Sequence, residues 1–225
     1  MMKNIFITGI DKGIGLALAE KFLDQGHFVF GTVLTQAPDL PLDNLQIFTL
    51  DLSSPESIEN CSREVLTTGK KIDVFINNAG ILIDKEEEGV VIEKLRQTLE
   101  VNLIGTIDLT EKLLPAVNTD GHVINISSSA GSLALTGSGT SHYPGHYPAY
   151  KISKTALNMY TRTLAERLKD QSITVSAVNP GWVKTDMGTE RADLEPQEVA
   201  TNIFNFALSK PETGHFWFKT EKMPW

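Results

Sequence analysis

Thr8-Gly9-Ile10-Asp11-Lys12-Gly13-Ile14-Gly15 is the stretch that decides the fold of this chain. It follows the apolar run Ile5-Phe6-Ile7, which predicts a buried strand at residues 3–8, and it opens a helical pattern at residues 13–25. Its three glycines allow a tight turn and a close approach between the helix and the strand. The chain is therefore predicted to begin with a strand, a glycine turn and a helix.

The same turn predicts a site for a dinucleotide. A pyrophosphate can approach glycine backbone closely, and the N-terminus of the following helix favours its negative charge. A plain structural turn would not require glycine at three positions. The residues of the turn that we expect to contact the cofactor are Gly9, Asp11, Lys12, Gly13, Ile14 and Gly15.

Two features bear on the choice between NADP and NAD. An acid at the end of the second predicted strand would bind the ribose 2′-hydroxyl of NAD, but residues 31–35 contain none. Lys12 is either a solvated lysine or the cation for the 2′-phosphate of NADP. We therefore favour NADP(H). NAD(H) stays open, because the arginine that often follows this strand in NADP-binding proteins is also missing.

Strand patterns alternate with helical patterns along the rest of the chain. Apolar strands separated by helices predict an α/β fold, in which one Rossmann-type domain over residues 1–225 has a doubly wound parallel sheet with helices on both faces. In such sheets ligands bind beyond the carboxyl ends of the strands. Further strands are predicted at 28–33, 46–50, 72–76, 122–126, 173–178 and, as an edge strand, 215–218; further helices are predicted at 55–67, 93–100, 103–117, 149–169 and 196–208.

Polar residues follow several of these strands. Asp51 and Leu52 end the third strand, where Asp51 is either an adenine ligand or an ordinary acid of a helix-capping loop. Asn77-Asn78-Ala79-Gly80 ends the fourth strand, and tandem asparagines at such a point usually tie backbone segments together through their amides. We expect Asn78, Ala79 and Gly80 to border the cofactor as well.

The longest helical pattern begins near Tyr150-Lys151-Ile152-Ser153-Lys154. Tyr150 and Lys154 are four residues apart and share one face of a helix. A free tyrosine has a pKa of about 10, and a nearby cation lowers that pKa toward neutrality. The spacing alone is common on solvated helices, so it gains meaning only from the other motifs.

Taken in chain order, the motifs resemble the short-chain dehydrogenase/reductase family over nearly the whole chain. Each matching piece is common alone, whereas the ordered set is specific. The ending from Gly214 to Trp225 is similar to that of C-factor-type and sniffer-type carbonyl reductases. The matching pieces are Thr8-Gly9 with Gly13-Ile14-Gly15, Asp51-Leu52, Asn77-Asn78-Ala79-Gly80, Asn102, Ser128 with Gly131, Tyr150 with Ser153-Lys154, and Pro180-Gly181 with Thr185.

The resemblance implies hydride transfer between a nicotinamide and a carbonyl or secondary alcohol, with four catalytic residues. Tyr150 would exchange the proton, Lys154 would lower the Tyr150 pKa and bind the nicotinamide ribose, and Ser128 would polarise the substrate oxygen. Asn102 would hold a relay water, although a helix-bending amide is the alternative. Pro180, Gly181, Val183 and Thr185 would complete the cofactor site, with Thr185 on the carboxamide.

Three points qualify this assignment. Tyr147 and Lys151 have the same spacing as Tyr150 and Lys154, but Pro148 suits a first helical turn and leaves Tyr147 at or before the cap. An insertion at about 136–146 lengthens the chain between Ser128 and Tyr150. It contains His142 and His146, yet Pro144-Gly145 between them and the lack of a third ligand argue against a metal. The 182–194 segment forms only a small substrate loop.

Composition limits the partners. The net charge of −8 disfavours nucleic acid and anionic membranes, which leaves a small-molecule carbonyl or alcohol. A single cysteine, Cys61, and the lack of a long apolar stretch lead us to expect a cytoplasmic protein. A homo-oligomer stays open. The alternative function is a dinucleotide-binding signalling or regulatory protein with little turnover, which intact Asn102, Ser128, Tyr150 and Lys154 argue against.

Overall fold

One mixed sheet organises the chain; the structure is a computed structural model that describes residues 1–41, 43–137 and 146–225. Within these residues the strands follow the order β3-β2-β1-β4-β5-β6-β7-β8, and all neighbours are parallel except β7 and β8. The strands are β1 (Asn4–Ile7), β2 (Phe28–Val33), β3 (Leu45–Thr49), β4 (Ile72–Asn77), β5 (Val117–Ile126), β6 (Thr174–Asn179), β7 (His215–Phe218) and β8 (Glu221–Met223). The α-helices are α1 (Gly13–Asp24), α2 (Pro55–Thr67), α3 (Ile92–Leu99), α4 (Thr106–Leu113), α5 (Pro148–Leu168) and α6 (Pro196–Leu208).

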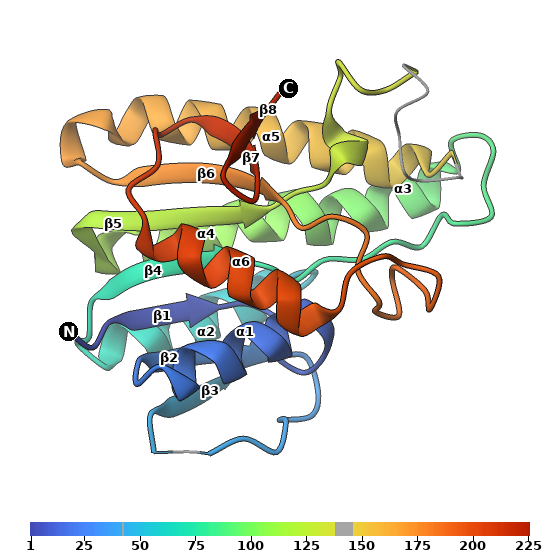
Figure 1. Ribbon diagram of the computed structural model, residues 1–225. Helices are drawn as coiled ribbons and strands as arrows, with labels where there is room; N and C mark the ends of the chain where they lie inside the picture. Colours follow the sequence, from blue (N-terminus) through green and yellow to red (C-terminus); the bar gives the residue numbers. More distant parts are fainter. Residues whose placement is uncertain (42, 138–145) are drawn as a thin grey trace.

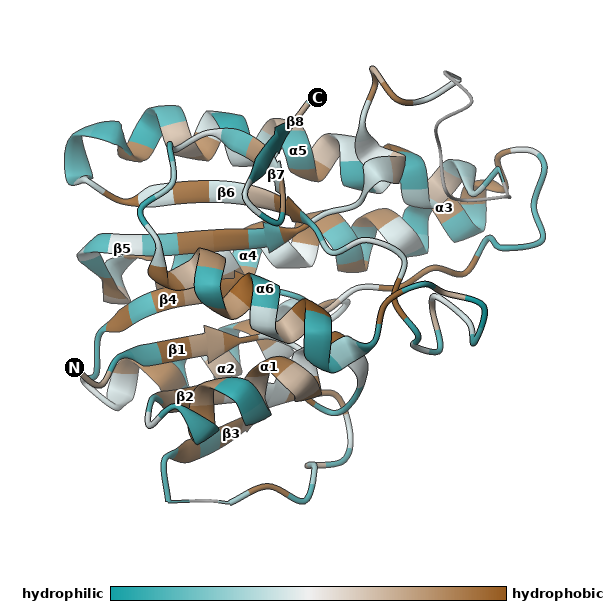
Figure 2. Cartoon of the chain, viewed as in Figure 1, coloured by the Kyte–Doolittle hydropathy of each residue, from teal (hydrophilic) through white to brown (hydrophobic). Residues whose placement is uncertain are grey.

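Both faces of the sheet are buried, which explains why its strands show so little polar alternation. Ile5 and Ile7 point to a cluster formed with α1 and α6, whereas Phe6 between them points to a cluster formed with α2, α4 and α5. The strands are accordingly apolar along their length, and the helices turn hydrophilic residues outward (Figure 2). The predicted doubly wound fold is confirmed.

The strand order reverses between β1 and β4, because the chain first builds outward through β2 and β3 and then returns. In doubly wound sheets such a reversal leaves a crevice at the carboxyl ends of the strands, and ligands bind there. The glycine turn before α1, the end of β4 and the end of β5 all lie on that side (Figure 1).

Four details of the sequence-based prediction were wrong. The 215–218 segment is not an edge strand, because β8 pairs with it in an antiparallel register, Phe216 opposite Met223. The predicted helix 103–117 ends at Leu113, followed by a 3-10 turn that contains Pro115, which lacks an N–H donor. β5 therefore begins at Val117, five residues earlier than predicted. The predicted helices at 93–100 and 103–117 are also one continuous segment, joined by a π-helix, η1 (Glu100–Gly105).

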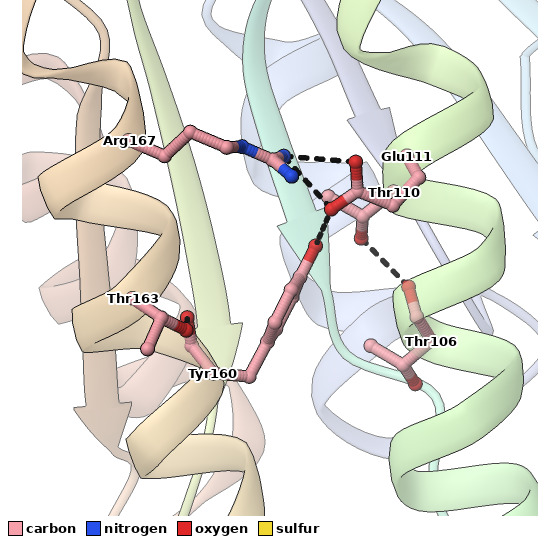
Figure 3. Close-up of polar contacts among 6 residues, drawn as sticks. All are labelled: Thr106, Thr110, Glu111, Tyr160, Thr163 and Arg167. Carbon is pink, nitrogen blue, oxygen red and sulfur yellow. Dashed lines mark hydrogen bonds and ion pairs between the residues drawn. The ribbon is translucent and has the colours of Figure 1, made fainter.

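The long helix α5 is fastened to α4 by a polar cluster (Figure 3). Arg167 donates to both carboxylate oxygens of Glu111 at 2.8 Å, and the Tyr160 hydroxyl donates to the same carboxylate at 3.0 Å. Burial, followed by the charge of Glu111, raises the Tyr160 pKa, so this phenol stays protonated and donates its hydrogen bond. The cluster fixes the C-terminal half of α5 against its neighbour.

His122 is a buried titratable group that makes stability depend on pH. Its imidazole contacts the Ser176 hydroxyl at 3.0 Å and the Ala207 carbonyl at 3.3 Å, and burial lowers its pKa from 6.5 to about 4. Between these values the unfolded chain binds the proton and the folded chain does not, so stability falls as the pH falls. At about pH 5 the free energy of unfolding is lower by roughly 2 kcal/mol than at neutral pH because of this group.

This dependence can be measured by urea unfolding of the wild type and of His122→Asn between about pH 4.5 and pH 8. The variant is expected to be less stable at neutral pH but to show a flatter acid limb. His146→Asn, which changes an exposed histidine, serves as the control. An acid limb equally steep in His122→Asn would contradict the assignment.

Candidate active site

The glycine turn is shaped for close backbone approach. Gly9 and Gly13 have φ angles of +71° and +58°, which favour glycine over other residues. A Cβ on Gly15 would lie 1.9 Å from the Gly9 carbonyl oxygen and 2.6 Å from the Asn78 side-chain nitrogen. No side chain fits at position 15, so the turn and the first helix can form only with glycine there.

Hydrogen bonds fix this turn to the end of β4. The Thr8 hydroxyl accepts from the backbone N–H groups of Asn78 and Ala79, both at 2.9 Å. The Asn78 amide donates to the carbonyls of Thr8 at 2.9 Å and Gly9 at 3.2 Å. Asn77 donates to Asn125 of β5 and to Thr110 of α4. Asn78 therefore ties backbone segments together, as predicted, whereas the Asn77 amide joins side chains of β5 and α4.

The N-terminus of α1 is suited to an anion. The residue at its cap position is Lys12, whose side chain makes no cap hydrogen bond, and the first turn contains no acid. In contrast, α2 is capped by the Ser54 hydroxyl and has Glu56 in its first turn. The backbone N–H groups and the positive end of the α1 dipole thus lie beside the glycine turn without a competing carboxylate from the first turn. These residues fit a pyrophosphate.

Lys12 joins the glycine turn to the 182–194 loop. Its ammonium lies 2.7 Å from the Asp186 carboxylate, and both side chains are largely exposed. The Asp186 hydrogen bond and charge raise the Lys12 pKa. Thr185 lies beside them, because a Cβ on Gly13 would be 3.2 Å from its methyl group. The lysine that we expect at the 2′-phosphate is therefore paired across the crevice with an acid that the sequence analysis did not single out.

The 182–194 loop is closed on itself by backbone hydrogen bonds. Leu194 donates to Trp182 at 3.1 Å, and Lys184 donates to Leu194 at 2.9 Å, so that buried Val183 pairs with Leu194. Gly181 enters the loop with a φ of +85°, and a Cβ there would lie 2.6 Å from the Leu194 side chain. Pro180, which precedes it, follows the end of β6. The loop thus holds Thr185 against the glycine turn.

Asp51 has the contacts of a loop acid. Its carboxylate accepts from the Ser53 N–H at 2.8 Å and from the Ser53 hydroxyl at 2.6 Å. Leu52 is buried, and a Cβ on Gly105 would lie only 1.9 Å from the Leu52 carbonyl oxygen. A contact between Asp51 and adenine stays a prediction.

The turn after β5 rests on α5 at the position of Lys154. The Lys154 ammonium donates to the Ile126 carbonyl at 2.8 Å, and a Cβ on Gly131 would lie 2.7 Å from the Lys154 carbonyl carbon. Between these two contacts lies buried Ser128, whose hydroxyl accepts from the Ala130 N–H at 3.1 Å. The neighbouring Ser127 donates to Asn158 and is committed to that contact.

Tyr150 and Lys154 are both buried on the face of α5 that meets this turn, each with 4% of its surface exposed. The Lys154 ammonium lies 5.6 Å from the centre of the Tyr150 ring. Burial lowers the Lys154 pKa from 10.5 to about 8. With this pKa the lysine still carries its charge at neutral pH, and that charge lies beside the Tyr150 ring.

Asn102 lies in the π-helix between α3 and α4, where its side chain makes three hydrogen bonds. It accepts from the Ile81 N–H at 2.7 Å and donates to the Ile81 carbonyl at 2.9 Å and the Ser153 hydroxyl at 3.1 Å. A Cβ on Gly80 would lie 3.1 Å from the Asn102 carbonyl oxygen and 3.6 Å from the Lys154 ammonium. Asn102 therefore joins the segment after β4 to α5, while its relay role stays a prediction.

A profile of short chain dehydrogenases matches residues 3–196 of the sequence. The chain belongs to the short chain dehydrogenase family. It is 33% identical over 204 residues to 3-amino-tetrahydro-pyrrolizinone reductase of Xenorhabdus hominickii, covering 89% of this chain and 68% of that one. It is also 33% identical over 202 residues to dehydrogenase/reductase SDR family member 9 of Bos taurus, of whose length it spans only 60%.

Solved structures of carbonyl reductases have the same fold. Carbonyl reductase Sniffer of D. melanogaster superposes with a TM-score of 0.88 at 27% identity over 100% of both chains. The NADPH-bound carbonyl reductase from chicken fatty liver gives 0.87 at 26% identity, over 100% of this chain and 99% of the other. The predicted similarity to sniffer-type reductases is confirmed, and this short chain dehydrogenase is an oxidoreductase.

The structure separates the two Tyr-x-x-x-Lys pairs of this dehydrogenase. Tyr147 occupies the cap position of α5 with a φ of +41°, and Tyr147 and Lys151 are each partly exposed. Tyr150 and Lys154 lie one turn further on and are buried. Most of the predicted 136–146 insertion, including His142 and Pro144-Gly145, lies outside the described residues.

Two residues of this dehydrogenase escaped the sequence analysis. Asp84 contacts the start of α5, and Asp186 pairs with Lys12. Asp84 is followed by Lys85 and Glu86-Glu87-Glu88, so it does not stand out among the acids of its loop, and Asp186 belongs to no motif spacing. In the part of the chain that the structure describes, no helix is long and apolar enough to cross a membrane, and no His, Cys, Asp and Glu side chains gather as a metal site.

Proposed function

We propose that this chain is an NADP(H)-dependent oxidoreductase that interconverts a carbonyl compound and a secondary alcohol, with Tyr150 as general acid and base. The observation that carries the proposal is the burial of Tyr150 beside the Lys154 ammonium, 5.6 Å from the ring centre. A cation beside a phenol favours the ionised form of that phenol, and so it opposes the rise in pKa that burial by itself causes.

NADP(H) supplies the hydride when bound. The glycine turn and the α1 N-terminus hold the pyrophosphate, Lys12 holds the 2′-phosphate, and Asp51 with Leu52 borders the adenine. Asn78, Ala79 and Gly80 line the crevice. The 180–185 segment, with Thr185, orients the carboxamide. The NADPH-bound chicken carbonyl reductase, with its similar fold, supports this choice of cofactor.

Side chains of the protein itself transfer the proton in this proposal. Ser128 polarises the substrate oxygen, and Tyr150 donates a proton to that oxygen as the carbonyl is reduced, or removes it in the reverse direction. Lys154 stabilises the resulting phenolate and binds the nicotinamide ribose. Asn102 holds the water through which the proton is replaced. The group that is proposed to touch the reacting atoms most directly is the Tyr150 hydroxyl.

A panel assay tests this function. NADPH absorbance is followed with ketones, aldehydes and quinones, and in reverse with secondary alcohols and NADP⁺. Turnover of at least one pair is expected. Tight NADPH binding with no turnover on the whole panel would favour the alternative, a dinucleotide-binding regulatory protein.

The cofactor preference leads to a separate prediction for Lys12→Ala. A charge-assisted contact to the 2′-phosphate contributes roughly 1.5–3 kcal/mol, so NADPH affinity is expected to fall about 10-fold to 100-fold while NADH affinity changes little. Titration of both cofactors by fluorescence measures this. Lys70→Ala, which removes a lysine over the Phe28 ring near the start of β4, is the control. Equal losses of affinity for NADPH and NADH would show that Lys12 does not bind the 2′-phosphate.

A further inference from the structure

Asp84 is a buried acid in the segment between β4 and α3, with 1% of its surface exposed. One carboxylate oxygen, Oδ2, accepts from the Ala149 N–H at 2.7 Å and lies 3.4 Å from the Tyr150 N–H. Ala149 and Tyr150 are the second and third residues of α5. An acid 66 positions away in the sequence therefore contacts the backbone of the proposed proton donor.

The start of α5 depends on such a contact. Pro148 occupies the first helical position and has no N–H, so Ala149 and Tyr150 carry the first N–H groups that no helical carbonyl can accept. Tyr147, at the cap position, has left-handed backbone angles rather than the extended ones usual for a cap, and tyrosine is not a capping residue. Asp84 supplies the acceptor and also places a negative charge at the positive end of the helix.

The second oxygen of Asp84 adds an independent observation. Oδ1 is buried and has no hydrogen-bond partner among the described residues. A buried carboxylate oxygen without a partner costs free energy. This cost offsets part of what the contact with α5 contributes to stability, as expected for an acid that also serves the site.

The segment that carries Asp84 is fixed at three points around the crevice. Ile81 exchanges two hydrogen bonds with Asn102, Asp84 holds α5, and the Lys85 ammonium donates to the Asp186 carbonyl at 2.9 Å. The far end of α5 is held independently by Glu111 and Arg167 (Figure 3). Asp84 thus relates the first turn of α5 to the residues expected to border the cofactor.

We infer that Asp84 is a positioning residue that holds the first turn of α5, and with it the Tyr150 hydroxyl, in the geometry that proton transfer requires. The inference rests on the proposed function. Side chains in helices lean toward the N-terminus, so a shift of the first turn moves the phenol directly. A displacement of about 1 Å can cost on the order of 10²-fold in rate.

Three variants test this. Asp84→Ala removes the acceptor, Asp84→Asn keeps one acceptor oxygen, and Ser54→Ala removes the cap of α2, where Ser54 accepts from the Ser57 N–H at 3.2 Å. Asp84→Ala is expected to lower kcat about 10-fold to 100-fold with NADPH affinity nearly unchanged. Asp84→Asn should recover most of kcat. Ser54→Ala should lower Tm about as much as Asp84→Ala does, but it should leave kcat unchanged.

Amide hydrogen exchange of the 147–153 peptide gives a readout without turnover. Asp84→Ala should speed exchange there and leave the α4 peptides unchanged. Unchanged exchange, an unchanged kcat, or a loss of kcat in Ser54→Ala equal to that in Asp84→Ala would each overturn the inference. Absence of turnover in the wild type would instead refute the proposed function, and the exchange result would still decide whether Asp84 holds the helix.

Discussion

Tyr150→Phe is expected to lower kcat by about 10²-fold to 10⁴-fold or more, while the Kd for NADPH stays within about twofold. The phenol hydroxyl is the only group removed. Phenylalanine fills the same buried space beside Lys154, so the fold and the cofactor site are expected to persist. Single-turnover kinetics with a substrate found in the panel, together with a fluorescence titration of NADPH, measures both quantities.

Tyr147→Phe is the matched control, because it makes the same chemical change three residues earlier. It is expected to keep near-normal kcat, since Tyr147 lies at the cap of α5 and is partly exposed. A large loss in Tyr147→Phe with retained activity in Tyr150→Phe would transfer the proton donor to the other pair, Tyr147 and Lys151.

Gly15→Ala has the second-largest expected effect. Its methyl group would lie 1.9 Å from the Gly9 carbonyl oxygen, so the backbone of the glycine turn must move. Such overpacking typically lowers the free energy of unfolding by about 1–3 kcal/mol. The shift also pulls the turn away from the Asn78 amide, and NADPH affinity is expected to fall more than about 10-fold. Thermal unfolding followed by circular dichroism and a cofactor titration measure the two losses.

Gly89→Ala is the control for this change. A Cβ at Gly89 meets no atom within 4 Å, and its backbone is not in the left-handed region. It should bind NADPH normally and unfold at the wild-type temperature. If Gly15→Ala behaved like Gly89→Ala, the described geometry of the turn would be wrong.

The sequence predicts the parts of the fold that repeat a strong local pattern. The apolar runs of β1 to β6 and the glycine turn are short-range signals, because burial on both faces leaves these strands few polar residues. β8 was missed, since Glu221-Lys222-Met223 has neither length nor apolar pattern and becomes a strand only by pairing with β7. The early start of β5 was missed because Val117 and the polar residues after it do not form an apolar run.

The candidate site divides in the same way. Tyr150 with Lys154 and the three glycines are local motifs that sequence can reveal. Asp84 and Asp186 instead contact residues that are far away in the sequence. Asp84 and Ala149 are 65 positions apart, and Lys12 and Asp186 are 174 positions apart. Asp84 is hidden among the acids Glu86-Glu87-Glu88 of its own loop, and Asp186 belongs to no motif, so only the folded chain brings each to its partner.

Transfer of deuterium from NADPH that carries deuterium at both C4 positions of the nicotinamide tests the central claim most directly. The wild type is expected to place deuterium on the carbinol carbon of the alcohol product, whereas Tyr150→Phe is expected to bind the labelled cofactor but transfer little or none. Bound NADPH with no deuterium in any product of the wild type, across the whole carbonyl panel, would contradict it.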